Sequence, residues 1–402
     1  MKLAIWLSVA TLTFSGLESS SFAVDKATLP HSMQLRAYAL RNSPNSADIS
    51  PDERFVVSES TLKTDRSDPK GQRFSEVVQV WNFKEDALLA EFAATEGVPG
   101  PPDTAQGAKI VRYSPDGRVV VALLNQTVYI LSATDLAKLR TISLTRPRIP
   151  TQNYAGMVVD IKTFVSSLEI SPDSKTVAIL WASDFTFGRI ELYSLSSGTH
   201  ILSWDTTDGW TGSTNGLHWH PNGEMLIVAI PIATSCGSRS HQPDIFAFDV
   251  KTGAINYKLT SGIDTPRVAV TSDNRVLVVE GQCAGPFSHN QAKLRVFDLT
   301  SGRRVHDGSA DILGVGESVS ASADGKRFLA STGQVAKKFD WVDVDFYYVD
   351  VDRKFSVWNL TTYSGIATSQ NIPALNESRL ELSHSGRFAL ALGKASFIFE
   401  LP

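Results

Sequence analysis

The two cysteines of the chain are the first residues whose types and spacing could support chemistry. Cys236 and Cys283 are each followed a few residues later by a histidine, His241 and His289. Two such pairs could hold a tetrahedral metal ion, but their spacings match no standard zinc module. A disulfide is favoured in an oxidising compartment, ahead of two free thiols and of a metal site. The sequence therefore predicts a Cys236–Cys283 disulfide, no metal and no cofactor.

Two further clusters contain residue types that bind metals. Alternation along a strand would place His218 and His220 on one side, but a histidine beside a Pro-Asn-Gly turn is usually a hydrogen-bonded structural residue. Aspartates between Asp340 and Asp352 alternate with apolar residues and could present carboxylates to Ca²⁺. No calcium-loop signature with its turning glycine accompanies them, so a solvated β-hairpin is the favoured interpretation.

Local catalytic motifs are missing from the sequence. It has no Gly-x-Ser-x-Gly elbow, no glycine-rich phosphate loop after a strand and no His-Glu-x-x-His pair. No catalytic residue is therefore predicted, although an active site assembled from several loops would leave no such motif.

An internal repeat must position all of these residues. An apolar strand, a tight polar turn and a second apolar strand occur seven times, and the turns begin at Ser50, Ser114, Ser171, His220, Thr271, Ser322 and Ser383. Proline presets φ in such turns, Asp or Asn binds the local backbone, and glycine tolerates a positive φ. Each turn is expected to join two strands.

A third strand follows each turn and ends in a recognisable triplet. The triplets are Val80-Trp81-Asn82, Ile130-Leu131-Ser132, Leu192-Tyr193-Ser194, Ala247-Phe248-Asp249, Val296-Phe297-Asp298, Val357-Trp358-Asn359 and Ile398-Phe399-Glu400. Several continue into a turn such as Thr252-Gly253 and then a fourth strand. Four short strands at a spacing of about 50 to 60 residues are typical of one propeller blade.

The two ends of the repeat complement each other. The last unit reaches Pro402 directly after its third strand, whereas Met33 to Leu40 is a spare alternating strand before the first unit. This strand can complete the seventh blade and so remove the exposed sheet edges. The sequence predicts an all-β, seven-bladed β-propeller with four-stranded blades, occupying residues 24–402 as one domain.

The triplets and the Ser-Pro-Asp-Gly turns resemble those of WD-repeat and related bacterial propellers. The resemblance covers nearly the whole chain after residue 23 and implies the propeller fold. The Gly-His pair that usually precedes a WD-repeat strand is missing, and the final Asp of the triplet is kept only at Asp249 and Asp298.

Differences in loop length indicate a working surface. The second-to-third strand connections are long in four blades, over Thr61 to Ser75, Pro231 to Pro243, Gly281 to Ala292 and Gly333 to Arg353. Because the topology repeats, these and the fourth-to-first connections should share one face, bearing Tyr154, Trp210, Arg239, His241, Phe287, His289, Trp341, Phe346 and Tyr347. Aromatic residues and arginine are enriched where partners bind. The alternative that these loops only pack on one another stays open.

Charge and the amino end limit the partners. The chain has 38 basic and 42 acidic residues and no Lys/Arg cluster, which disfavours nucleic acid and anionic membranes. Met1-Lys2, the apolar run Leu3 to Phe14 and Ser21-Phe22-Ala23 have the form of a signal peptide cleaved after Ala23. That run is shorter than the roughly 20 residues a membrane span requires. We expect a periplasmic or secreted monomer.

These features favour an exported protein-binding or scaffold module that holds a protein or peptide through its long loops. One alternative is a propeller-type enzyme with its site at the channel mouth, either a hydrolase or lactonase or a quinoprotein-like dehydrogenase. A structural role in envelope assembly is a third possibility.

Overall fold

The computed structural model describes residues 36–40, 44, 46–63, 73–94, 98–99, 109–124, 126–147, 152–154, 157–159, 163–183, 188–206, 216–229, 245–260, 266–280, 294–308, 319–340, 345–361, 364–368, 379–392 and 396–401. These residues form strands and turns and contain no helix. Within this part of the chain, therefore, no helix has the length and apolar character needed to cross a membrane.

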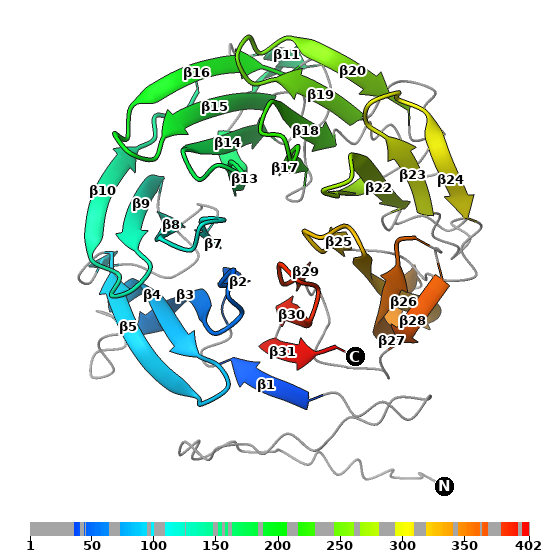
Figure 1. Cartoon of the computed structure of the whole chain (residues 1–402), viewed down its shortest axis with the longest axis horizontal. Helices are drawn as coiled ribbons and strands as arrows, with labels where there is room; N and C mark the ends of the chain where they lie inside the picture. Colours follow the sequence, from blue (N-terminus) through cyan, green and yellow to red (C-terminus); the bar gives the residue numbers. More distant parts are fainter. Residues whose placement is uncertain are drawn as a thin grey trace, which may run out of the picture.

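Seven antiparallel sheets surround a central axis as the blades of a propeller (Figure 1). The first three blades are β2 (Ser46–Ile49), β3 (Val56–Lys63), β4 (Arg73–Asn82) and β5 (Ala87–Ala93), with β6 (Val98–Pro99) also paired to β4; β7 (Ile110–Tyr113), β8 (Val119–Leu124), β9 (Thr127–Ser132) and β10 (Lys138–Ser143); and β13 (Thr163–Ile170), β14 (Thr176–Ser183), β15 (Gly188–Ser194) and β16 (His200–Asp205).

The next three blades repeat the same strand order. They are β17 (Leu217–Trp219), β18 (Met225–Ala229), β19 (Ile245–Asp249) and β20 (Ile255–Leu259); β21 (Pro266–Val270), β22 (Arg275–Glu280), β23 (Leu294–Asp298) and β24 (Arg304–Gly308); and β25 (Val319–Ala321), β26 (Arg327–Asp340), β27 (Asp345–Asn359) and β28 (Ser364–Thr368). Every third strand ends at the last residue of its predicted triplet, which confirms that reading of the repeat.

The seventh blade joins the two ends of the repeat. It consists of β29 (Arg379–Leu382), β30 (Phe388–Leu392), β31 (Ser396–Glu400) and β1 (Arg36–Leu40). Strand β1 pairs antiparallel with β31, so that Arg36 lies opposite Glu400 and Leu40 opposite Ser396 (Figure 1). The predicted closure by an amino-terminal strand is confirmed.

Hydrophobic packing closes the ring as well. Seven clusters of buried residues fill the seven spaces between neighbouring blades, and each cluster takes side chains from both of its blades. In the space between blades 7 and 1, for example, Phe388 and Ile398 pack with Ala47 and Val56. Burial of these side chains is the main force that holds blade to blade.

The turns between first and second strands explain why their sequences repeat. In blade 2, the Ser114 hydroxyl donates a hydrogen bond to the Asp116 carboxylate at 2.6 Å and accepts one from the Val119 backbone N–H at 3.0 Å. The fourth turn residue has a positive φ in every blade, at Glu53, Gly117, Ser174, Gly223, Asn274, Gly325 and Gly386. Glycine is frequent there because it has no Cβ to clash in this conformation.

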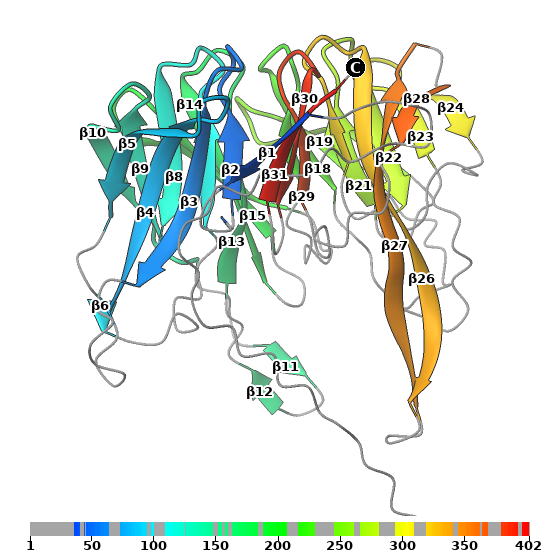
Figure 2. The same ribbon diagram turned by 90° about the horizontal axis from the view of Figure 1, so that it is seen from below.

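The two ends of the channel differ (Figure 2). The seven turns lie at one end, here named the turn face. From the opposite end, the hairpin face, β26 and β27 extend well beyond the other strands, and β11 (Gln152–Tyr154) pairs with β12 (Met157–Val159) at the same end. Over its described residues, the segment from Gly333 to Arg353 is therefore a β-hairpin, as favoured from its alternating sequence, with one register shift between Gln334 and Val335.

Candidate functional site in the central channel

The innermost strand of each blade contributes one equivalent residue to the channel, at the place two residues before its turn begins. We call this the ring position. It is occupied by Asp48, Arg112, Glu169, His218, Ala269, Ser320 and Glu381. All seven line one cavity of about 270 Å³. Five of the seven are ionisable, so the propeller concentrates charged groups from five blades around a single space.

Arg112 is the cation around which the carboxylates gather. Its Nη2 donates a hydrogen bond to Glu381 Oε1 at 3.0 Å, and its Nη1 donates to the Val111 carbonyl at 2.8 Å. Burial disfavours the charged guanidinium, but the charges of Glu381, Glu169 and Asp48 outweigh burial and raise the pKa of Arg112. One guanidinium therefore interacts with carboxylates from three other blades.

The carboxyl groups hold protons unusually strongly. Burial raises the pKa of Asp48 from 3.8 to about 7, against the attraction of Arg112 and a hydrogen bond from the Tyr113 N–H at 2.8 Å. Burial likewise raises the pKa of Glu169 from 4.5 to about 7, with repulsion from Glu381 and Asp48 adding to it. The pKa of Glu381 is also raised by burial. The charge of the ring therefore changes around neutral pH.

Some ring side chains connect neighbouring inner strands. Asp48 Oδ2 accepts the Tyr113 N–H of blade 2, and Ser320 Oγ accepts the Leu382 N–H of blade 7 at 2.9 Å. Glu169 differs, because no described residue donates a hydrogen bond to its carboxylate. Asp48 and Ser320 thus have a structural role that Glu169 does not share.

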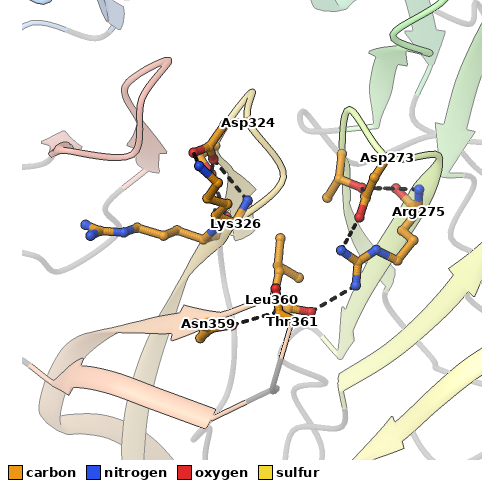
Figure 3. A network of polar contacts seen from close by, with 10 residues as sticks. Asp273, Arg275, Asp324, Lys326, Asn359, Leu360 and Thr361 are labelled. Carbon is orange, nitrogen blue, oxygen red and sulfur yellow. Dashed lines mark hydrogen bonds and ion pairs between the residues drawn. The ribbon is translucent and has the colours of Figure 1, made fainter.

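A polar network at the turn face secures the blades beside the channel (Figure 3). Arg275 of β22 contacts the Asp273 carboxylate and donates a hydrogen bond from Nη1 to the Leu360 carbonyl of blade 6 at 2.9 Å. In blade 6, Asp324 accepts the Lys326 N–H at 3.0 Å. These contacts join blades 5 and 6 and are structural.

Most of the predicted binding residues lie outside the described residues: Trp210, Arg239, His241, Phe287, His289 and Trp341, together with Cys236 and Cys283. Tyr154 ends β11, and Phe346 and Tyr347 belong to β27, where they lie opposite Phe339 and Lys338. β11 and the end of the β26–β27 hairpin lie at the hairpin face (Figure 2). The binding surface, the disulfide and the signal peptide stay predictions.

The histidine motif divides between two roles. His220 Nδ1 lies 2.6 Å from Asn222 Oδ1 inside its turn, which confirms the structural interpretation for this residue. His218 lines the channel cavity. No group of three potential ligand residues in the described part of the chain is arranged to hold a metal ion.

The channel ring was missed from the sequence, although a signal was present. When the seven turns are aligned, the residues two places upstream read Asp, Arg, Glu, His, Ala, Ser and Glu. Such a position in a first strand otherwise suits apolar or small residues, because inner strands are enclosed by their neighbours. Ionisable residues at five equivalent places indicated the channel rather than the loops.

The fold defines a seven-bladed β-propeller with four-stranded blades. No family model matches the chain, and no curated protein matches it. Among solved structures, it is similar to a chain of Kuenenia stuttgartiensis hydrazine synthase, with a TM-score of 0.56 and 13% identity over 90% of this chain and 96% of that one. At this identity the similarity shows the shared fold alone.

Proposed function

We propose that this protein is an exported propeller that binds a protein or peptide partner through its hairpin face. The observation that carries the proposal is the length of the β26–β27 hairpin. Strand β25 pairs with β26 only as far as Ala330, and β28 pairs with β27 only from Ser356 onward. Beyond those points no other described strand is hydrogen-bonded to the hairpin, so its backbone edges are suited to receive an added strand.

The sequence of the hairpin supports the same role. Its outer half contains Phe339, Phe346, Tyr347 and Tyr348, and the register places Phe339 opposite Phe346. Aromatic residues are enriched in binding hot spots because they bury a large area at a small cost in side-chain entropy. A rigid ring of blades holds such a projection without refolding on binding.

The proposal is tested by shortening the hairpin. Thr332 and Lys354 lie opposite each other, so replacing residues 333–353 with Asn-Gly should close a two-residue turn and leave the blade intact. Wild type, this variant and a control variant, Leu139→Ser on the exposed outer strand β10, are used for affinity capture from the native envelope. We expect one partner to be retained by wild type and control and reduced at least about tenfold in the shortened variant.

Two outcomes contradict this function. One is that wild type captures nothing specific. The other is that the shortened variant, with its melting temperature retained, captures the same protein equally well.

An enzymatic role at the channel is the second candidate. Asp48 and Glu169, with pKa values of about 7, could exchange protons with a substrate at neutral pH, as general acids and bases do. Hydrolysis of an ester or lactone that is lost in a folded Glu169→Gln variant would support this candidate. Activity that persists in the variant would count against it.

A further inference from the structure

We propose that the channel cavity is a binding site for a small organic cation with ammonium or guanidinium groups. This proposal is independent of the hairpin face. Its basis is the composition of the cavity wall, which takes ring residues from all seven blades. The described ring carries three carboxyl groups, from Asp48, Glu169 and Glu381, against one guanidinium, Arg112.

Arg112 cannot satisfy three carboxylates equally. Its hydrogen bonds go to Glu381 and to the Val111 carbonyl. Asp48 receives a backbone N–H, while the Glu169 carboxylate receives no hydrogen bond from any described residue. A carboxylate in a half-buried position without a donor is costly, and a cation with N–H groups would compensate for that cost.

A second buried polar group, beside the cavity, also lacks a partner. Tyr113 lines the same cavity, is only 7% exposed, and has a hydroxyl without a hydrogen bond to any described residue. Buried hydroxyl groups are normally hydrogen-bonded. Tyr113 also packs in the hydrophobic cluster between blades 1 and 2, so the Glu169 carboxylate is the group that a cation in the cavity would bind.

The size of the cavity and the spacing of its groups restrict the ligand. A volume of about 270 Å³ lies at the lower end of the range of small-molecule pockets, so the ligand must be small. Within the described residues, no three acidic, histidine or cysteine side chains are placed to coordinate one metal ion. An organic cation with two charged ends can contact carboxylates on different blades without requiring them to converge on one point.

The test compares three molecules of similar length at pH 8 and constant ionic strength by titration calorimetry. They are 1,4-diaminobutane, the neutral 1,4-butanediol and the anion succinate. The neutral and anionic probes show whether binding depends on the positive charges of the ligand. We expect one molecule of the diamine to bind per chain, at least about tenfold more tightly than either other probe.

Two variants locate the site. Glu169→Gln should weaken diamine binding at least about tenfold, because it removes the charge and preserves the shape. Glu85→Gln makes the same chemical change in an exposed turn outside the cavity and should leave binding unchanged. Melting temperatures show whether both variants are folded.

The pH dependence of the wild type is a second measurement that needs no variant. The groups facing Glu169 across the cavity are Arg112 of β7, Asp48 of β2, His218 of β17 and Glu381 of β29. Proton uptake by the carboxylates should weaken diamine binding at least about tenfold between pH 8 and pH 6. Absence of saturable diamine binding, stronger binding of succinate, or equal affinity in Glu169→Gln would each overturn the proposal.

Discussion

Arg112 is a single side chain that affects the ionisation of the other charged groups in the channel. It is the only arginine whose guanidinium lies among the ring residues that the structure describes, and it interacts with Asp48, Glu169 and Glu381. Removing one partner of a buried ionic cluster leaves uncompensated charge, which is more harmful than never having had the cluster. The stability of the protein should therefore depend on this residue in a way that varies with pH.

The Arg112→Met variant tests that dependence. The folded pKa values of Asp48 and Glu169, about 7, lie above their ordinary values of 3.8 and 4.5. Their contribution to the free energy of unfolding is therefore greatest below about pH 4 and falls as the pH rises through 7, when the carboxyls ionise in the channel. Without Arg112 this loss should be larger.

We expect Arg112→Met to lower the free energy of unfolding by about 3 to 5 kcal/mol at pH 8, and by clearly less at pH 5. Urea unfolding at both pH values measures the difference. Arg118→Met is the control, since the Arg118 side chain is 85% exposed and its pair with Asp116 should contribute little. Equal destabilisation at the two pH values would show that the carboxyls do not respond to Arg112.

The sequence could have located these residues but not their chemistry. The repeat assigns Glu169 and Glu381 to equivalent places, and the turns that follow them make the register unambiguous. The shared guanidinium and the raised pKa values depend on distances across the channel, between residues of different blades; Arg112 and Glu381, for example, are 269 positions apart in the sequence. Such contacts exist only after the ring has closed.

At the scale of elements, the turn is the unit that the sequence encodes most directly. The hydrogen bonds within one turn join residues at most five positions apart, as from the Val119 N–H to Ser114 Oγ. Such short-range interactions can be recognised in a short stretch of sequence without the rest of the chain. For this reason the sequence predicts all seven turns and all seven third-strand ends. The long connections between strands contain no comparable local signal, so their conformation cannot be derived from the sequence in the same way.

Substitutions at two turn glycines distinguish the cost of a positive φ from the cost of a steric clash. Gly223 and Gly386 have φ values of 74° and 71°. A Cβ on Gly223 would approach only Pro172 Cδ, at 4.0 Å. A Cβ on Gly386 would come within 2.9 Å of Ser322 Cβ in the neighbouring turn of blade 6.

Gly223→Ala should therefore cost about 1 to 2 kcal/mol of stability, the price of a left-handed conformation for a residue with a Cβ. Gly386→Ala should cost more, because the turns of blades 6 and 7 must also move apart. Chemical denaturation of both variants measures the order. If Gly386→Ala proved the milder change, the packing between these turns would be looser than the distances indicate.

The whole molecule is held by contacts between its two ends. Beside the β1–β31 pairing, Glu53 Oε1 of blade 1 accepts hydrogen bonds from the Ser385 N–H at 3.0 Å and the Ser385 hydroxyl at 2.6 Å. Tyr38 of β1 packs edge-on against Phe83, with ring centroids 5.3 Å apart. Closure thus has a backbone, a polar and an aromatic component.

Deleting residues 1–42 should open the ring, whereas deleting residues 1–32 should leave it closed. The longer deletion removes β1 and exposes the edge of β31, so we expect a melting temperature lower by about 5 °C or more, together with self-association through the free edge. Calorimetry and size-exclusion chromatography measure both effects. Equal melting temperatures and monomeric behaviour of the two proteins would mean that three strands suffice for the seventh blade.

The β1–β31 pairing also orders events in time. Residues 36–40 are synthesised before the first six blades, yet their partners at 396–400 are synthesised after them. Six blades can each form from one contiguous segment, but the seventh must wait until both of its segments are present. Until then the backbone groups of β1 are unpaired and could pair with strands of other chains. Misassembly is therefore most favoured just before the ring closes.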